Sequence, residues 1–229
     1  MRVIEILSSR REYTKLNPLV VLLGKGDHQI TSSWTNQNGA NRQTTLEITR
    51  SNITFVGAGK DTTTILGGFG ISEFENITFK HMTVTNTSGR GLGLNIRNAK
   101  VELFDVALKG CNHAALYIPN TTSETTVVAT RCEFANSMYG AAAHGSLTSL
   151  TFNNCLFHDN SNDGVYGTEA TIHLHGEATA IHSNGECGIF AMNSCKVLIH
   201  LPSHHNTFYN NTREDRDTRN GGTITNVED

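Results

Sequence analysis

Apolar residues recur along the middle of the chain in four similar sets. Within each set, two apolar residues lie two positions apart, one extra position follows, and two more apolar residues again lie two positions apart. The first residues of successive sets are separated by 24 (101 − 77), 26 (127 − 101) and 23 (150 − 127) positions. A period of roughly 20–50 residues is typical of a solenoid, in which each repeat packs on its neighbours. The sets are Ile77, Phe79, Met82 and Val84; Val101, Leu103, Val106 and Leu108; Val127, Ala129, Cys132 and Phe134; and Leu150, Phe152, Cys155 and Phe157.

The spacing within a set predicts two short strands. Alternation at period two buries one face of a strand, and the extra position marks a bend between the two strands. A second apolar group follows each turn, for example Leu116 with Ile118 and Ile189 with Ala191, and predicts a third strand. We therefore expect an all-β, right-handed parallel β-helix of about seven coils, each about 22–26 residues long.

Turn residues recur two positions beyond the last apolar residue of each set. Asn86, Gly110, Asn136 and Asp159 occupy these positions. Asn and Gly tolerate positive φ, which a sharp corner of a solenoid requires. The pattern predicts corners at these residues, with asparagine side chains hydrogen-bonding along the stack.

The two ends of the chain differ from the repeats. Residues 3–11 read as a short amphipathic helix that caps the first coil. The stretch from Asn210 is polar and charged, which favours a flexible segment. We expect one β-helix domain over residues 1–209, divided into an N-terminal cap at 1–17 and coils at 18–209, with a polar C-terminal segment at 210–229 and a last edge strand at 223–225.

Composition narrows the classes of partner. The 18 Lys and Arg residues are scattered and the net charge is −3, so no basic stripe for nucleic acid is present. No apolar run reaches the ~18–20 residues that span a bilayer, and no signal peptide is visible. Five cysteines, with Cys132 and Cys155 at inward positions, favour an intracellular location, whereas five Asn-X-Ser/Thr sequons favour the opposite.

Two stretches carry a family resemblance. Residues 52–65 read NITFVGAGKDTTTI, and residues 19–30 read LVVLLGKGDHQI. The first is similar to an early coil of pectin-lyase-like β-helix proteins, including pectin methylesterases, and the second resembles β-helix domains of microalgae. The resemblance implies a right-handed coil sense, which agrees with the general rule for parallel crossovers. It leaves function open, because the superfamily contains lyases, hydrolases, epimerases, phage tailspikes and non-catalytic modules.

One column of polar turn residues follows the coil period and is a candidate catalytic site. Arg90, His113, Tyr139, Asp163 and Glu186 are separated by 23, 26, 24 and 23 positions. In such a column Tyr or His would act as base, Arg would hold a carboxylate, and the acids would protonate the substrate or bind a cation. The alternative is that exposed turns are polar in any coil.

Histidines supply candidate metal ligands. His158 and His182 are 24 residues apart, beside Asp159, and His173 shares a strand face with His175, with His200 in the next coil. His and Asp are metal-ligand types, but a site needs three or four converging ligands, so surface histidines are the alternative explanation. We predict no cofactor.

Catalytic motifs of the superfamily are absent. His144-Gly145 and His175-Gly176 lack the leading glycine of the polygalacturonase Gly-His-Gly element, and no adjacent pair of aspartates is present. Whether the chain is an enzyme therefore stays undecided. Three functions are open: a non-catalytic module that binds glycan or a protein partner along one face, a uronan lyase, hydrolase or epimerase that uses the polar column, and a structural or assembly element.

Overall fold

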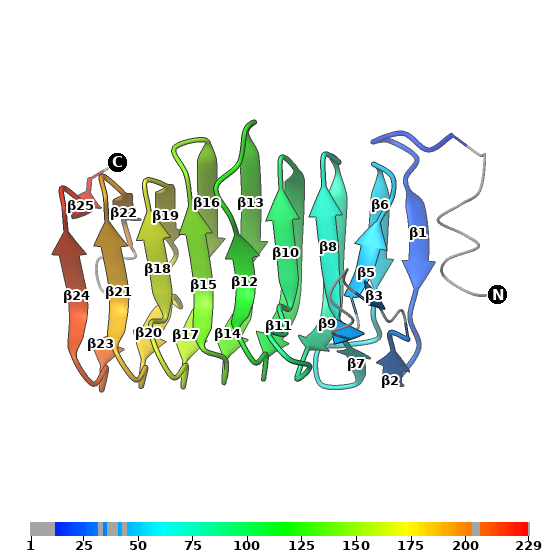
Figure 1. The fold of residues 1–229 in the computed structure, drawn as a ribbon, viewed down its shortest axis with the longest axis horizontal. Coiled ribbons are helices and arrows are strands. Elements are labelled where there is room, and N and C mark those ends of the chain that lie inside the picture. Colours follow the sequence, from blue (N-terminus) through cyan, green and yellow to red (C-terminus); the bar gives the residue numbers. More distant parts are fainter. Residues whose placement is uncertain (1–11, 32–33, 36–40, 43–44, 203–206, 229) are drawn as a thin grey trace.

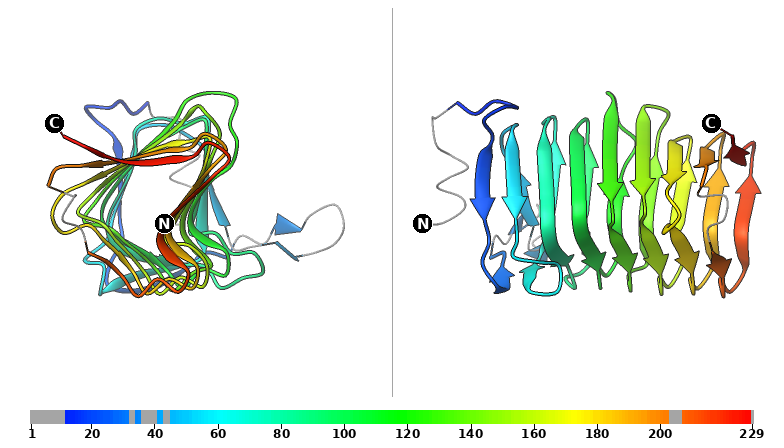
Figure 2. Two further views of the ribbon diagram at one scale, coloured as in Figure 1. Left: turned by 90° about the vertical axis from the view of Figure 1, so that its left-hand side faces the viewer. Right: turned by 180° about the vertical axis from the view of Figure 1, so that it is seen from behind.

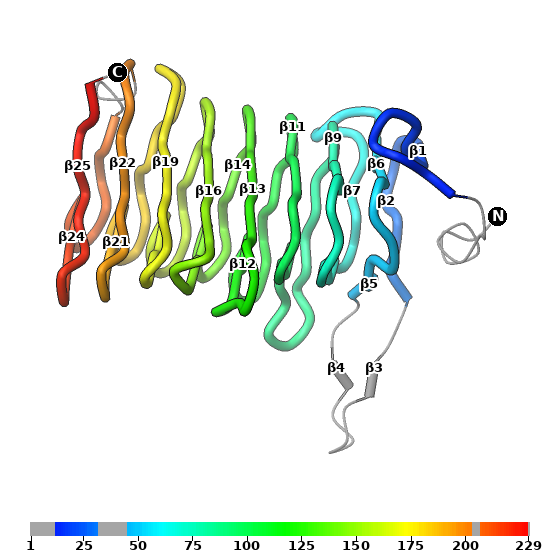
Figure 3. The backbone as a smooth tube through the Cα atoms, turned by 90° about the horizontal axis from the view of Figure 1, so that it is seen from above, coloured from blue at the N-terminus to red at the C-terminus, as the bar shows by residue number. Residues whose placement is uncertain are grey.

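The computed structural model describes residues 12–31, 34–35, 41–42, 45–202 and 207–228, which form a right-handed β-solenoid of about seven turns (Figure 1). Three walls of parallel strands enclose the core (Figure 2). Strands of successive coils lie side by side along each wall (Figure 3). The chain is therefore all-β with a parallel coiled topology, as the repeat predicts.

The first and second walls belong to one 15-stranded sheet, because β9 (Ile77–Thr85) and β11 (Lys100–Lys109) run through both walls without a break. The other strands of the first wall are β1 (Leu19–Leu22), β6 (Ile53–Val56), β13 (Thr125–Thr130), β16 (Thr148–Asn153), β19 (Thr171–His175), β22 (Lys196–His200) and β25 (Thr223–Val227). The others of the second wall are β2 (Gly26–Gln29), β7 (Thr63–Leu66), β14 (Glu133–Ala135), β17 (Leu156–His158), β20 (Ala180–His182) and β23 (Phe208–Tyr209).

The third wall is a separate eight-stranded sheet. Its strands are β5 (Thr45–Ile48), β8 (Gly68–Ser72), β10 (Leu94–Arg97), β12 (Ala114–Ile118), β15 (Tyr139–His144), β18 (Val165–Thr168), β21 (Cys187–Met192) and β24 (Glu214–Arg219). A short antiparallel pair, β3 (Trp34–Thr35) and β4 (Asn41–Arg42), belongs to none of the walls.

The four apolar sets are the core of the solenoid. Ile77 pairs with Val101, Val101 with Val127, and Val127 with Leu150, so the first residues of the sets lie in register. Every member of the four sets is buried, with at most 2 % of its surface exposed. The alternation in the sequence therefore predicted the inward positions correctly, because a side-chain period of two leaves one face of each strand for the interior.

The bends between strands depend on positive φ. The extra position of each apolar set is a residue in the left-handed region: His81, Asp105, Arg131 and Asn154 have φ between 50° and 56°. The predicted corners at Gly110, Asn136 and Asp159 also have positive φ, at 65°, 51° and 54°. Asn86 is an exception, since its φ is not positive. It is buried instead, and its Nδ2 donates to the carbonyl of Leu92 at 3.0 Å.

A ladder of asparagines, of which Asn160 and Asn184 are buried, stabilises the corner between the second and third walls in later coils. Asn160 Nδ2 donates to Asn184 Oδ1 at 3.0 Å, and Asn184 Nδ2 donates to Asn211 Oδ1 at 2.9 Å. Each side chain also forms a hydrogen bond with the backbone. For example, Asn160 Nδ2 donates to the carbonyl of Phe134 at 3.1 Å. The hydrogen bonding predicted along the stack is therefore present, but one residue after the predicted corner positions, because Asn136 and Asp159 themselves adopt the left-handed turn.

The predicted capping helix at residues 3–11 lies outside the described residues, and the part of the chain that is described contains no helix, so the structure does not support this helix. The described portion of the cap is an irregular segment on the first coil. The Arg50 guanidinium lies 4.7 Å from the centre of the Tyr13 ring, and Asn52 Nδ2 donates to the Tyr13 carbonyl at 2.8 Å. The described residues contain no helix that is long and apolar enough to cross a membrane.

The polar C-terminal segment extends the walls beyond residue 209. β24 pairs with β21, and β25 pairs with β22 over Thr223–Val227, which includes the predicted edge strand. Backbone hydrogen bonds to the preceding coil do not depend on side-chain polarity, so a charged sequence can still add a coil. The sequence boundary at residue 209 therefore does not coincide with an end of the sheets.

Five free cysteines complete the interior. All five are buried and none forms a disulfide. Burial raises the pKa of the Cys111 and Cys187 thiols to about 11, and the pKa of Cys195 to about 12. Cys132 and Cys155 occupy the inward positions predicted for them and act as small apolar side chains.

Candidate functional site

The five residues of the predicted polar column do not lie on one line of the third wall. The sheet register joins Leu94 to Leu116, Leu116 to Ala141, and Ala141 to Val165, which are steps of 22, 25 and 24 residues. The predicted column advances by 23 from Arg90 to His113 and by 26 from His113 to Tyr139. A difference of one residue moves a side chain to the other face of a strand. The nearly constant spacing in the sequence therefore did not align the five side chains of the column.

His113 and Tyr139 are brought together. Their ring centres are 5.8 Å apart, although the register pairs Tyr139 with Ala114. Burial lowers the pKa of His113, and the positive charge of Arg90 lowers it further. Both effects keep the imidazole of His113 neutral near pH 7.

The carboxyl groups of the two acids of the column make other contacts. Asp163 is only 5 % exposed, and its Oδ1 accepts a hydrogen bond from the backbone N of Cys187 at 2.9 Å. Burial raises the pKa of Asp163 to about 6, although this hydrogen bond lowers it, and the negative charge of Glu186 raises it. Glu186 itself is half exposed and lies 3.8 Å from the guanidinium of Arg213. Asp163 thus supports a corner of the solenoid, and no carboxylate of the column faces solvent beside Tyr139.

A closed ring of aromatic side chains lies instead on the outer surface of the third wall. Each ring touches the next, and the order around the circle is His113, Tyr117, His144, Tyr166 and Tyr139. The five successive ring centres are 5.9, 5.6, 5.5, 5.7 and 5.8 Å apart. We call these five residues, together with Phe190, the aromatic cluster.

The sheet register explains how the cluster closes. Ala142 pairs with Tyr117 on one side and with Tyr166 on the other, and its small side chain leaves space for the surrounding rings. The rings cover Ala142, which is 2 % exposed, while each ring keeps part of its own surface accessible. Alanine at this position thus allows large side chains from three coils to meet over one point.

The cluster continues toward the C-terminal end of the wall. Tyr166 contacts Phe190 of β21 with ring centres 5.7 Å apart, and the guanidinium of Arg219 lies 5.2 Å from the centre of the Phe190 ring. The cluster therefore extends over β12, β15, β18 and β21, which are neighbours in the front sheet of Figure 1. Four coils at about 4.8 Å spacing give an aromatic strip on the order of 15 Å long.

Polar groups are available around the rings. Asn162 Nδ2 donates to the Tyr139 hydroxyl at 3.2 Å, and Thr168 Oγ1 donates to the Tyr166 hydroxyl at 3.1 Å. Among the described residues, Asn95 Oδ1 and His113 Nδ1 are buried atoms for which the protein supplies no hydrogen-bond partner. Burial lowers the pKa of His144, and the charge of His113 adds to this, so both cluster histidines are neutral at pH 7.

The sequence contained a pattern that indicates this cluster and that is separate from the polar column, namely outward aromatic residues in the third strand of several coils. Tyr117, Tyr166 and Phe190 are each the outward residue between two inward apolar positions of the third strand. Tyr139 and His113 belong to both the column and the cluster. His144 could not be predicted from the period, because it reaches its neighbours diagonally across the sheet.

The candidate metal ligands His158 and His182 stack on the second wall, with ring centres 5.2 Å apart. Both nitrogens of His158 face carboxylates: Nδ1 lies 2.7 Å from Asp159 Oδ2, and Nε2 lies 3.4 Å from Glu133 Oε1. The hydrogen bond with Glu133 and then the neighbouring Asp159 raise the pKa of His158, against the effect of burial. Because both ring nitrogens of His158 contact carboxylates, this pair acts as an ionic and stacking contact. His182 continues the stack onto Tyr209, 4.5 Å away.

A different histidine group lies on the outer face of the first wall. His173, His175 and His200 bring their ring nitrogens within 4.8 Å of one another, and no other such group of three ligand-type residues occurs in the described parts of the chain. Burial lowers the pKa of His173, and the charge of His200 lowers it further.

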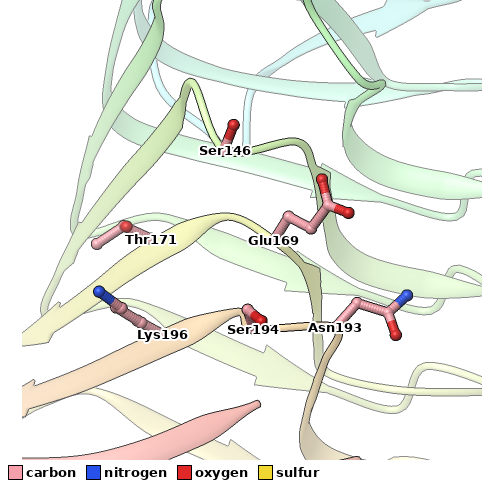
Figure 4. A pocket seen from close by; sticks show the side chains of 6 residues that line it. All are labelled: Ser146, Glu169, Thr171, Asn193, Ser194 and Lys196. Atoms are coloured by element: carbon pink, nitrogen blue, oxygen red, sulfur yellow. The ribbon is translucent and has the colours of Figure 1, made fainter. Parts of the chain in front are cut away.

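A polar pocket of about 480 Å³ opens at the corner between the third and first walls (Figure 4). Its lining side chains come from three successive coils, with Thr171 and Lys196 on neighbouring strands. The pocket contains no aromatic side chain, unlike the cluster on the third wall. Its lining residues are Ser146, Glu169, Thr171, Asn193, Ser194 and Lys196.

Residues 92–227 match the model of the family described as right handed beta helix region, and the chain belongs to this family. The match covers most of the coils, including β24 and β25. Together with the walls described above, it defines the protein as a right-handed β-helix protein. No curated protein matches the sequence.

Solved structures with the same fold share little sequence with this chain. A pectate lyase from Bacillus sp. N165, solved in complex with trigalacturonate, is 13 % identical with a TM-score of 0.62, and the match covers 98 % of this chain and 76 % of that one. A pectin methylesterase from carrot is 12 % identical with a TM-score of 0.53, over 98 % of this chain and 81 % of that one. ORF18 of Geobacillus virus E2 is 13 % identical with a TM-score of 0.50, and the match covers 93 % of this chain but only 53 % of the viral one. At such identities the likeness concerns the fold alone.

Proposed function

We propose that this β-helix binds a polysaccharide along its third wall and that the aromatic cluster is the surface on which the sugar rings pack. The observation that carries the proposal is the closed ring of five aromatic side chains around Ala142, extended by Phe190. The strip crosses four coils, so an oligosaccharide segment fits it better than a single sugar.

The physical reason is the shape and chemistry of a pyranose ring. One face of such a ring presents C–H groups, which gain free energy when they cover an aromatic face, while the hydroxyls at its edge need hydrogen-bond partners. The tyrosine hydroxyls supply polar atoms at the edge of the cluster. Mutual contacts already hold the rings in place, which lowers the entropic cost of binding.

Two arginines make an acidic polymer the first ligand to test. Arg219 lies over the Phe190 ring at one end of the cluster, and the charge of Arg90 acts on His113 at the other. A guanidinium is well suited to hold a carboxylate. The pectate lyase structure contains trigalacturonate, a uronic acid oligomer, which supports the same choice of ligand class.

Binding without catalysis is the function that we propose. The enzymatic alternative requires an acid beside Tyr139, and the carboxyl group of Asp163 is instead buried against the Cys187 backbone. Glycan binding, by contrast, depends on the residues of the aromatic cluster, which share one accessible surface.

The experiment measures affinity for polygalacturonate, alginate and a neutral glucan by titration calorimetry. Tyr166→Ala and Tyr117→Ala remove central rings, and each is expected to weaken binding about tenfold, since a lost stacking contact costs about 1.4 kcal/mol. Tyr209→Ala is the matched control, because Tyr209 is 41 % exposed and stacks on a histidine of the second wall. Absence of binding to all three polymers, or an equal loss in the control, would overturn the proposal.

A further inference from the structure

Three histidines from two neighbouring coils face outward at one point of the first wall. In β19 the burial alternates so that Ile172 and Leu174 are inside, which leaves His173 and His175 on the outer face. In β22 Val197 and Ile199 are inside in the same way, and His200 faces outward. The register pairs Leu174 with Ile199, and its continuation brings His200 beside His175.

The ring geometry confirms that the three side chains meet. The centres of the His175 and His200 rings are 4.0 Å apart, and those of His173 and His200 are 5.2 Å apart. His173 Nδ1 lies 2.9 Å from His200 Nε2. A hydrogen bond between two imidazoles needs one nitrogen that carries a proton and one that does not, so at least one of these rings is neutral.

We propose that His173, His175 and His200 form a binding site for a divalent transition-metal ion, with Zn²⁺ as the representative ion. Each residue offers one ring nitrogen, and these nitrogens all lie within 4.8 Å of one another. In a tetrahedral site with Zn–N bonds of 2.0–2.1 Å, two ligand nitrogens are about 3.3 Å apart. The ring nitrogens therefore have to move from separations of up to 4.8 Å to about 3.3 Å. Rotation about side-chain torsions is enough for this, and the backbone of β19 and β22 does not have to move.

The ligand set also determines which ions fit. Three imidazoles without a thiolate or carboxylate suit Zn²⁺, Cu²⁺ and Ni²⁺, whereas Ca²⁺ and Mg²⁺ require oxygen ligands. Three protein ligands leave one coordination position open for water or a further ligand. Because the ligands come from two strands, a bound ion also cross-links β19 to β22 and stabilises the C-terminal coils.

The contrast with the other stacked histidines supports this assignment. His158 and His182 also stack in register, but Glu133 and Asp159 occupy both nitrogens of His158. The side chains that the register sets beside the three histidines are uncharged: Thr151 pairs with His173, Asn153 with His175, and Val227 with His200. The metal site lies on the first wall and the aromatic cluster on the third, so neither proposal depends on the other.

The test titrates the full chain with Zn²⁺ in competition with a chromophoric chelator, and repeats the titration with Ni²⁺ and Ca²⁺. We expect one Zn²⁺ per chain, no competition by Ca²⁺, and a rise in the unfolding temperature when Zn²⁺ is added. His175→Gln and His200→Gln should each weaken Zn²⁺ binding more than about 100-fold, since loss of an outer-shell partner alone costs 10–100-fold.

Two controls make the result specific. His182→Gln removes a histidine of the other stack, and the double substitution His204→Gln with His205→Gln removes the two histidines that follow the site in sequence; both variants should bind Zn²⁺ as the unmodified chain does. Binding that is absent, or lost in a control but kept in His175→Gln and His200→Gln, would overturn the proposal. Circular dichroism verifies that the variants are folded, which is expected for His175→Gln and His200→Gln because these two side chains face outward.

Discussion

Replacing Asp163 with asparagine isolates the effect of a buried carboxyl group on stability. Asp163 is 5 % exposed, and burial raises its pKa from 3.8 to about 6. An asparagine has nearly the same shape, and its Oδ1 can still accept the hydrogen bond from the Cys187 backbone. The substitution therefore removes the ionisation while keeping the contact.

The magnitude and sign follow from linkage between protonation and folding. A rise in pKa from 3.8 to about 6 corresponds to about 3 kcal/mol, at 1.36 kcal/mol per unit. The pKa of Asp163 is higher in the folded state than in the unfolded state, so protonation of this carboxyl group favours the folded state. This contribution to the free energy of unfolding is fully present below pH 3.8 and is lost as the pH rises through about 6. Asp163→Asn should therefore differ little from the unmodified chain at pH 4, and should be more stable by about 3 kcal/mol at pH 7.5.

The assay is urea unfolding of both proteins at several pH values between 4 and 8, and the quantity of interest is the difference between them. Other titratable groups, such as His113 and His158, are present in both proteins, so their contributions cancel in the difference. Asp61→Asn is the control, because it removes the same charge from an exposed turn and should give a constant difference. A difference for Asp163→Asn that is equally constant with pH would refute the reasoning.

Other predictions concern the interior and its corners. Asn160→Ala leaves the Ser137 N–H and the Phe134 carbonyl without their partner. At about 1–3 kcal/mol for each of these two groups, urea unfolding should show a loss of about 2–6 kcal/mol in the free energy of unfolding. Asn153→Ala on the outer face of β16 should change it by no more than about 0.5 kcal/mol. Phe157→Ala removes a fully buried ring that stacks on Phe134 at 4.8 Å, and should cost about 3–5 kcal/mol in the same assay; a loss below about 1 kcal/mol would contradict close packing there. The five thiols should not react with a thiol-specific reagent at pH 8 until urea unfolds the chain, because burial raises the pKa of Cys111 and Cys187 to about 11; labelling in the native state at the rate of a free thiol would contradict this.

Much of the fold could be predicted from the sequence because a solenoid core depends on local periodicity. Phe79 and Leu103 are both inside because each takes an inward position of the period-two alternation, and one coil length brings them together. The extra position at His81 and Asp105 also predicted a bend correctly, since the skipped residue has to turn in the left-handed region. The burial of Cys132 and Cys155 follows from the same pattern.

The candidate site could not be predicted in the same way, because side chains at similar turn positions of successive coils do not all point to the same side of the wall. Asp163 looked equivalent to Tyr139 in spacing, yet its carboxyl group turns inward to the Cys187 backbone while the Tyr139 ring joins the outer surface. The aromatic cluster closes through diagonal contacts, such as that of His144 with Tyr117, which no single period describes.

The sequence by itself determined which side chains form the core and how long each coil is, because strand alternation and coil length are local properties of the chain. Only the tertiary structure decided which outward side chains meet. Ala142 becomes the centre of five rings, and His200 reaches His173 and His175, through the lateral register of stacked strands. That register depends on the length of every intervening turn, and a shift of one residue exchanges the inner and outer faces.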